Sequence, residues 1–326
     1  MVMWRKVHGL LIALGVLYFG IAASHSAEPL TLSLSRTPLS LPFFIAEQEG
    51  FFAAEGVAIK ITEVIGGHRS LQQVLDGTAD LGTCSEAVVM FNSFKRDDFA
   101  ILATFVNSAE DIKVIAHPDS GITKAAHLTG KRVGTVVGSA SHYYLTSLAL
   151  INGVEPQSVK VVAAQPEEVA KALSQREVDA IASWQPYAYQ AEQAVPGARV
   201  IPDGGFYSLA FNLVVSRRLA GRRDAELEKL LRAVARAEDF ITRHPAKAQA
   251  ALRNRLALDQ TYLNWHWPRY RYRLSLDQSL LTTLESEARW ARAEGLVTAG
   301  RSPNYLKFIH SAPLRKTFPA AVGIGE

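Results

Sequence analysis

Strand and helix patterns alternate along the first two thirds of the chain, and this alternation limits the possible fold more than any other feature. Residues 30–34 alternate apolar and polar side chains as a strand does, and Pro42 opens a helical run that ends at Gly56. The same order returns several times up to about residue 211. This succession predicts an α/β fold with mostly parallel sheets covered by helices on both faces.

The pattern changes after Phe211. From Ala225 to Phe308 the sequence is almost entirely helical in character, and Leu227, Leu230 and Leu231 fall on one helical face. We expect these helices to pack against a sheet that the earlier strands have already formed.

The length of the chain predicts two lobes. About 300 residues follow the first segment, which exceeds the size at which a single hydrophobic core usually stops growing. No linker rich in Pro, Gly or Ser separates two blocks of sequence, so we expect the lobes to share the chain through two crossings. We place these crossings at residues 116–121 and near Asp203–Gly205. Residues 27–116 plus 208–326 then form lobe 1, and residues 117–207 form lobe 2.

The first 26 residues have the three parts of a secretory signal peptide. Arg5 and Lys6 precede an apolar stretch, Gly9–Ala23, which is shorter than the roughly 20 residues of a membrane-spanning helix. Small residues follow, and cleavage after Ser26 places serine at both critical positions. The only cysteine, Cys84, lies too far away to carry a lipid at that site. We therefore expect a mature protein that is free in the periplasm and has no internal disulfide.

The charge balance argues against a nucleic-acid partner. The net charge of +4 includes Arg5 and Lys6, and without them 33 basic side chains face 31 acidic ones. Residues 265–273 do interleave aromatic and basic side chains, as surfaces for single-stranded nucleic acid do. In an exported protein we interpret this run as a packed segment between helices or as a docking patch for a membrane permease.

The candidate site is the sheet edge at which parallel strands end and helices begin. Four segments meet there, and each places small or hydroxyl residues before a helix. Free backbone N–H groups and positive helix ends then face the cleft and can hold an anion without a fixed positive charge. The segments contribute Ser35 and Thr37; Gly66, Gly67 and His68; Thr83 and Ser85; and Ser139, Ser141 and His142.

Trp184 follows a predicted strand at residues 178–181 and so reaches the same edge. A tryptophan in this position can cover the apolar part of a ligand, and the alternative is ordinary packing under the second lobe.

Motifs of catalysis and metal binding are incomplete in this sequence. Residues 138–142 lack the second glycine of the hydrolase Gly-x-Ser-x-Gly elbow, and residues 130–134 lack the order of a phosphate-binding loop. The histidines show no metal-ligand spacing. We expect no catalytic residue, no metal site and no cofactor.

An ordered set of segments carries a resemblance to a known family. These segments are residues 42–57, 75–82, 128–134, 178–180 with 184–186, 276–278 and 302–304. In them the chain resembles the solute-binding proteins for aliphatic sulfonates, taurine and nitrate, a family that also includes binders of thiamine-pyrimidine precursors. The resemblance implies the two-lobed type II periplasmic-binding-protein architecture, with Gly66, Gly67, Ser85, Ser139, Ser141 and Trp184 lining the ligand cleft.

The resemblance also implies a function. Such a protein is the monomeric substrate-binding component of an ABC transporter, which closes around its solute and delivers it to the permease without turnover. Two alternatives remain: a binder of a pyrimidine-type heterocycle, and an enzyme of the same fold in thiamine-pyrimidine synthesis. The related enzymes use a cysteine-rich cluster that this sequence lacks. A sensory module of the same architecture is not separated by sequence.

Glu86 departs from the pattern of this family, because sulfonate binders tend to be neutral at this position. Facing the ligand, Glu86 would pair with an ammonium group or a ring N–H. Facing outward on the first turn of its helix, it would complement the helix dipole.

Overall fold

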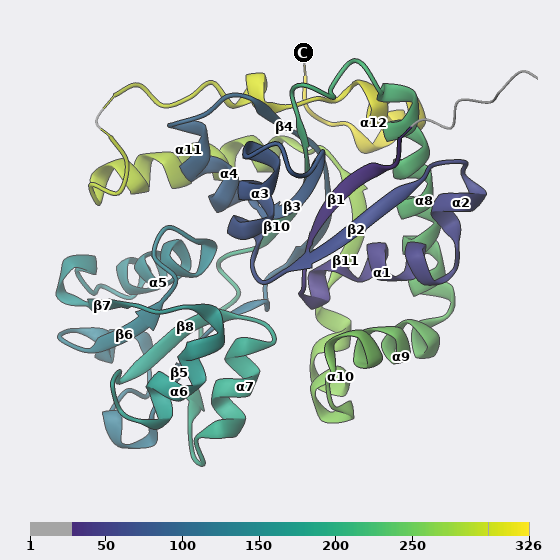
Figure 1. The fold of residues 1–326 in the computed structure, drawn as a ribbon. Coiled ribbons are helices and arrows are strands. Elements are labelled where there is room, and N and C mark those ends of the chain that lie inside the picture. Colours follow the sequence, from purple (N-terminus) through teal and green to yellow (C-terminus); the bar gives the residue numbers. More distant parts are fainter. Residues whose placement is uncertain (1–27, 299, 326) are drawn as a thin grey trace, which may run out of the picture.

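The computed structural model describes residues 28–298 and 300–325, and Figure 1 shows an α/β molecule with two lobes, each built on its own sheet. The signal peptide expected at residues 1–26 lies outside the described residues. Within the described part of the chain, no helix is long and apolar enough to cross a membrane.

Lobe 1 contains a six-stranded sheet whose strands come from distant parts of the sequence. β1 pairs in parallel with β2 and β3, whereas β10 runs antiparallel to β3 and β4, and β11 runs antiparallel to β4. In spatial order the strands are β11 (Arg271–Ser275), β4 (Phe99–Ser108), β10 (Leu209–Ser216), β3 (Leu81–Ser85), β1 (Leu30–Ser35) and β2 (Ile59–Val64).

Lobe 2 contains a five-stranded sheet. β6 pairs in parallel with β7 and β8, and β5 runs antiparallel to β8 and β9. In spatial order the strands are β7 (Lys160–Ala163), β6 (Arg132–Thr135), β8 (Ala180–Trp184), β5 (Ile112–Ala116) and β9 (Arg199–Val200).

Helices cover these sheets, and the largest of them shows why the sequence folds in this way. α8 buries Leu227, Leu230, Leu231 and Val234 at helical spacing and packs against α1, α2 and α12. The helices are α1 (Leu41–Gln48), α2 (Phe51–Ala54), α3 (Gly67–Leu75), α4 (Glu86–Ser93), α5 (Ala140–Ile151), α6 (Val169–Ser174), α7 (Tyr187–Ala194), α8 (Asp224–Arg243), α9 (Pro245–Leu256), α10 (Gln260–His266), α11 (Gln278–Ala293) and α12 (Ala312–Thr317).

The two-lobed α/β architecture is confirmed, but the expected strand direction is wrong and the expected helical region is interrupted. Both sheets are mixed rather than mostly parallel, because the alternation of side chains records burial and not strand direction. The region 225–308, expected to be almost entirely helical, also contains β11. Tyr272 of this strand donates its hydroxyl to the carbonyl oxygen of Pro38 at 3.0 Å, so this tyrosine packs against the segment that precedes α1.

The first crossing between the lobes comes earlier than residues 116–121. The sequence places residues 112–116 in lobe 1, but β5 pairs with β8 and β9 of lobe 2, so the chain crosses between Ser108 and Ile112. An apolar run such as residues 112–116 can form a buried strand in either sheet, and only the strand pairing shows which lobe contains it. The chain returns between β9 and β10, in the stretch that contains Asp203–Gly205.

Two glycines let α3 lie unusually close to β3. A Cβ on Gly67 would lie 2.7 Å from the Cα of Cys84, and one on Gly82 would lie 2.9 Å from the Oγ of Ser70. Larger residues would push the helix away from the sheet. This close approach fixes where α3 begins, at the edge that faces lobe 2.

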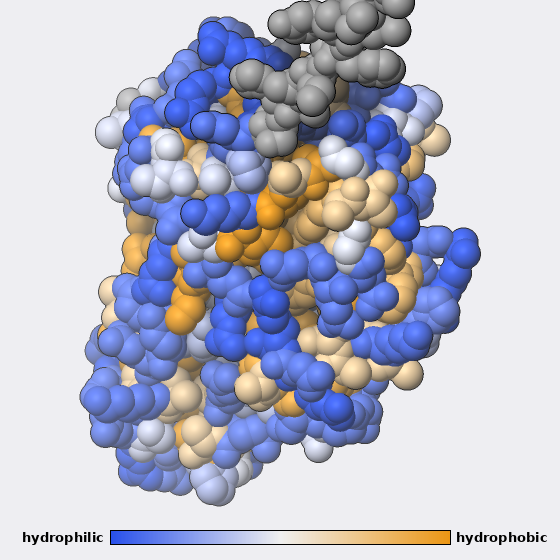
Figure 2. Space-filling view, turned by 45° about the vertical axis from the view of Figure 1, so that its right-hand side comes forward, coloured by the Kyte–Doolittle hydropathy of each residue, from blue (hydrophilic) through white to orange (hydrophobic). Residues whose placement is uncertain are grey.

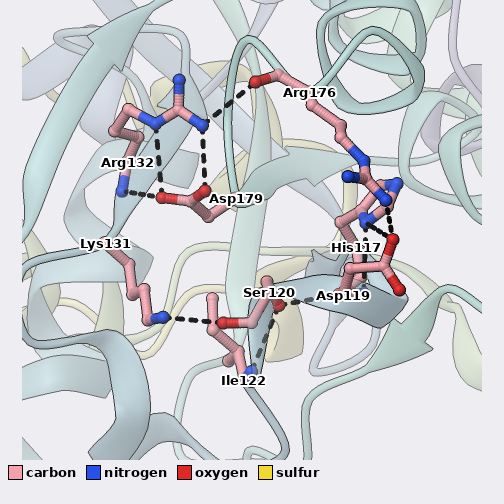
Figure 3. A network of polar contacts seen from close by, with 8 residues as sticks. All are labelled: His117, Asp119, Ser120, Ile122, Lys131, Arg132, Arg176 and Asp179. Carbon is pink, nitrogen blue, oxygen red and sulfur yellow. Dashed lines mark hydrogen bonds and ion pairs between the residues drawn. The ribbon is translucent and has the colours of Figure 1, made fainter.

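A polar network closes the end of the lobe 2 sheet that points away from lobe 1 (Figure 3). The guanidinium of Arg132 donates to both carboxylate oxygens of Asp179, with the shorter bond at 2.9 Å. The backbone N–H of Arg132 adds a further bond at 2.8 Å. Arg176 pairs with Asp119 beside His117. These contacts tie the start of β6 to the start of β8 and the end of β5, opposite the strand ends that meet lobe 1.

The outer surface of the molecule is largely hydrophilic on the face drawn in Figure 2, with a band of hydrophobic residues across its upper part. The large buried side chains lie in two clusters, one of which extends from lobe 1 into lobe 2. The lobes are therefore joined by packed side chains as well as by the two crossings.

Candidate functional site: a pocket between the lobes

A small pocket lies between the two sheets. Its walls combine hydroxyl groups with apolar side chains, and both lobes contribute. The lining residues are Ser35, Thr37, Leu39, Gly67, His68, Ser85, Val88, Asp111, Ser139, Ala140, Trp184, Leu209 and Phe211.

Three helices begin at this pocket. α3 starts at Gly67, α4 follows Ser85 and α5 follows Ser139. At none of the three does the N-cap side chain accept a hydrogen bond from the first turn of its helix. The first N–H groups and the positive helix ends are therefore directed toward the pocket without this competing acceptor, which suits an anionic group.

Ser139 is held in place by a backbone carbonyl oxygen and by a neighbouring hydroxyl group. Its Oγ donates to the carbonyl oxygen of Val136 at 2.6 Å and lies 2.8 Å from the Oγ of Ser141. Ser141 lies in turn 2.9 Å from the Oγ1 of Thr135. Ser141 is completely buried, so it positions Ser139 instead of lining the pocket.

Seven of the eleven predicted site residues line the pocket, namely Ser35, Thr37, Gly67, His68, Ser85, Ser139 and Trp184. The other four lie in the layer behind it. Gly66 precedes α3, and the Oγ1 of Thr83 accepts from the backbone N–H of Ser35 at 2.9 Å. His142 packs its ring against Trp290, with centroids 5.4 Å apart.

His68 and Trp184 supply the two largest rings of the pocket that the sequence predicted. Burial lowers the pKa of His68, so the neutral imidazole dominates at pH 7 and offers one donor and one acceptor instead of a positive charge. Trp184 is half-buried and stands at the end of β8. Its indole contributes apolar surface next to the hydroxyl groups.

The sequence did not single out six lining residues. Leu209 and Phe211 come from β10, which runs antiparallel into the site and therefore escapes the rule that ligands meet the carboxyl ends of parallel strands. Asp111 lies on the first crossing, which was placed several residues too late. Val88 and Ala140 lie in the first turns of the predicted helices α4 and α5, whereas Leu39 lies in a short 3-10 helix, Pro38–Ser40, that the sequence did not predict.

Glu86 takes neither of the two orientations considered from the sequence. It is completely buried and is absent from the pocket lining. Its Oε1 accepts from the hydroxyl of Tyr207 and its Oε2 from the backbone N–H of Ala210 at 3.0 Å. Burial raises the pKa of Glu86 to about 7. The carboxyl group of Glu86 thus binds the end of the second crossing, at Tyr207, and the start of β10, at Ala210.

Contacts between the lobes flank the pocket. Arg69 of α3 reaches Glu167 at 3.1 Å. The hydroxyl of Tyr189 on α7 donates to the carboxylate of Asp259, which caps α10, at 2.9 Å. Both pairs are partly exposed and can separate at little free-energy cost.

Cys84 is unsuited to nucleophilic chemistry. Its side chain is completely buried in β3, and burial raises the pKa of the thiol well above its ordinary range. The reactive thiolate is therefore suppressed. Among the described residues, no group of three or more His, Cys, Asp or Glu side chains is arranged to hold a metal ion.

The architecture is that of the periplasmic binding proteins. A structure of the periplasmic aliphatic sulphonate-binding protein from Escherichia coli superposes with a TM-score of 0.76 at 19% identity, covering 87% of this chain and 92% of that one. The alkanesulfonate-binding protein from Xanthomonas axonopodis pv. citri, bound to MOPS, gives a TM-score of 0.75 at 19% identity and covers 91% of this chain and 99% of that one.

The family model described as NMT1/THI5 like matches residues 37–248, and the chain belongs to this family. A relative from Bacillus subtilis (strain 168), named as an aliphatic sulfonates-binding protein, is 25% identical over 180 residues, which cover 53% of this chain and 54% of the relative. The chain thus matches little more than half the length of this curated relative.

Some relatives that match over a shorter part of the chain, and a solved structure with a lower TM-score, are named as enzymes. A 4-amino-5-hydroxymethyl-2-methylpyrimidine phosphate synthase from Legionella pneumophila is 27% identical over 137 residues, covering 42% of this chain and 43% of the relative. A desulfurization enzyme shares the fold with a TM-score of 0.64 at 18% identity, over 89% of this chain and 99% of that one. The relatives and structures with the stronger similarity are binding proteins.

Proposed function

We propose that this chain is the substrate-binding component of an ABC transporter. It captures a small sulfonate, taurine-like or related anionic or zwitterionic solute in the periplasm and delivers it to the permease. The observation that carries this proposal is the pocket between the lobes, at which α3, α4 and α5 begin without a side-chain cap. The relatives and structural neighbours named for sulfonate binding support the solute class.

The mechanism we propose is hinge closure of a monomer. Within the described residues, the chain passes between the two sheets only at residues 109–111 and 201–208, and short double crossings of this kind allow two lobes to rotate. Solute that binds first to one lobe is enclosed when the other lobe adds its contacts. The pairs Arg69–Glu167 and Tyr189–Asp259 then hold the closed form that the permease recognises.

A thermal-shift panel tests the solute class. The panel contains alkanesulfonates, taurine, nitrate and pyrimidines, because a ligand at 100 times its Kd adds about 2.7 kcal/mol to the free energy of unfolding. We expect the sulfonates to raise the melting temperature. An unchanged melting temperature with every compound would remove the sulfonate class, whereas a response to pyrimidines alone would favour the heterocycle-binding alternative.

Small-angle X-ray scattering tests closure. We expect the radius of gyration to fall when a binding sulfonate is added. Tyr189→Phe is the matched variant, because it removes the bond to Asp259 and leaves the pocket lining unchanged. This variant should show a smaller fall at the same ligand saturation. A radius that does not respond to ligand in the unaltered protein contradicts hinge closure.

A further inference from the structure

Asp111 is a lining residue of the pocket with one buried carboxyl oxygen that has no hydrogen-bond partner. The residue is only 1% exposed, and the oxygen without a partner is Oδ2. A buried polar atom without a partner destabilises the folded protein by about 1–3 kcal/mol, and more when it carries a charge. Such an atom in a ligand pocket indicates a group that gains its partner when the solute binds.

Hydrogen bonds hold the other carboxyl oxygen of Asp111, Oδ1, and its backbone carbonyl oxygen in place. The hydroxyl of Tyr270 donates to Oδ1 at 3.0 Å, and the carbonyl oxygen of Asp111 accepts from the backbone N–H of Gln185 at 2.9 Å. These bonds come from the segment before β11 and from the end of β8. They fix the direction of the carboxylate before any solute arrives, as expected of a preorganised binding group.

No positive side chain of the pocket neutralises Asp111. The thirteen lining residues include neither lysine nor arginine. The nearest lysine along the strand, Lys113, places its Nζ 2.8 Å from both Glu110 and Asp203. Lys113 is thus engaged by two other carboxylates.

We propose that the Oδ2 atom of Asp111 accepts a hydrogen bond from an N–H group of the solute, so that the solute carries an amine beside its anionic group. This inference rests on the proposed function, and it narrows the solute from an anion or zwitterion to an amino-substituted sulfonate or carboxylate. The anionic end meets the helix starts and the hydroxyls of Ser35 and Ser85, and the amine meets Asp111.

Trp184 provides a second, independent feature for the amine. Ile112 is the partner of Trp184 in the pairing of β5 with β8, so Asp111 and Trp184 lie at neighbouring positions on the same end of these strands. Both line the pocket. An ammonium group between a carboxylate and an indole face gains a charge-assisted hydrogen bond and a cation–π contact.

Matched solute pairs test the proposal by calorimetry with the mature chain. Taurine is compared with propane-1-sulfonate, and β-alanine with butyrate, because the members of each pair differ in an amine and a methyl group. We expect the amine to strengthen binding at least tenfold. In Asp111→Asn this preference should fall to about twofold or less. Equal binding within the pairs, or an unchanged preference in Asp111→Asn, overturns the proposal.

The two pairs separate this inference from the proposed function. Preference for β-alanine without any sulfonate binding would refute the sulfonate class and support the role of Asp111. Binding of propane-1-sulfonate as tightly as taurine would support the sulfonate class and overturn the role of Asp111.

A stability measurement decides the case in which none of the four probes binds. In the ligand-free protein Asp111→Asn should leave the melting temperature unchanged or raise it, because burial already disfavours the charged carboxylate and raises its pKa to about 7. Asp179→Asn, at the paired carboxylate of the same lobe, is the control and should lower it. A fall in Asp111→Asn as large as in Asp179→Asn assigns Asp111 a structural role and overturns the proposal.

Discussion

Replacing Gly67 by alanine should damage the pocket by moving the start of α3. The new Cβ would lie 2.7 Å from the Cα of Cys84, 2.9 Å from its Cβ and 3.3 Å from the carbonyl oxygen of Thr83. These atoms belong to β3, which pairs on both sides with β1 and β10 and cannot move aside. Ordinary Cβ contacts begin at 3.4 Å, so the helix has to move outward by about 0.7 Å.

This displacement has two consequences of calculable size. Overpacking at a buried contact lowers the free energy of unfolding by about 1–3 kcal/mol, which corresponds to several degrees in melting temperature. A hydrogen bond near 2.9 Å that lengthens by this amount is lost. Each bond lost between the helix start and a charged solute weakens binding by about 1.5–3 kcal/mol, or roughly tenfold to a hundredfold in Kd.

Gly134→Ala is the matched control for Gly67→Ala. Gly134 lies in β6, and a Cβ there would meet the side chains of Val178 and Ile181 at 3.4 Å or more, which is ordinary contact. It does not line the pocket. Calorimetry with a binding sulfonate should show a loss of affinity in Gly67→Ala, and thermal unfolding should show a lower melting temperature. Gly134→Ala should show neither loss. Unchanged binding by Gly67→Ala would refute the idea that the close approach of α3 positions the site.

Other regions of the molecule give three further predictions. Trp184→Ala should weaken the binding of alkanesulfonates roughly tenfold or more, as measured by calorimetry. The loss should grow with the length of the alkyl chain, because each buried CH₂ contributes about 0.8 kcal/mol. An equal loss of affinity at all chain lengths would contradict contact between Trp184 and the alkyl chain. Glu287 is completely buried, both its carboxylate oxygens lack partners, and burial raises its pKa. The folded protein therefore loses stability as the pH rises from about 4.5 through the raised pKa of Glu287. Glu287→Met removes this carboxyl group, so the variant's gain in melting temperature should be larger at pH 8 than at pH 5. A gain that does not depend on pH would argue against this effect of burial. The hydrogen bonds from Arg132 lower the pKa of Asp179, so the pair stabilises the fold above pH 3.8 and the contribution disappears as the pH falls through the lowered pKa. Denaturant titration should show that Asp179→Asn costs about 1 kcal/mol or less at pH 7, since the pair is partly exposed, and that the difference shrinks below pH 4.

Local chemistry accounts for the part of the site that could be predicted from the sequence. Ser85 and Ser139 stand directly before helical runs, and such residues at the carboxyl ends of parallel strands meet at one sheet edge whatever the details of packing. Trp184 follows from the same rule. The hydroxyl and glycine segments are therefore sufficient to predict the position of the pocket from the sequence.

Pairing and burial explain the part that could not be predicted. The strand pattern of residues 112–116 fits either sheet, and its place in lobe 2 moves the first crossing to residues 109–111 and brings Asp111 into the pocket. Leu209 and Phe211 arrive on an antiparallel strand, for which the edge rule gives no expectation. Ser141 looked like a ligand residue from its spacing, but its hydroxyl is used to hold Ser139.

The amino-acid order alone predicts the two-lobed α/β architecture and the edge on which the site lies, because these depend on periodicity and on the succession of strands and helices. The family followed from the resemblance of an ordered set of segments. The tertiary structure decided strand direction, the position of the crossings and the roles of the two buried acids near the site. Glu86 is satisfied by Tyr207 and Ala210, whereas Asp111 keeps one oxygen for the pocket. Whether a carboxyl oxygen has a hydrogen-bond partner depends on donors from segments that are distant in the sequence. These segments come together only when the chain has folded.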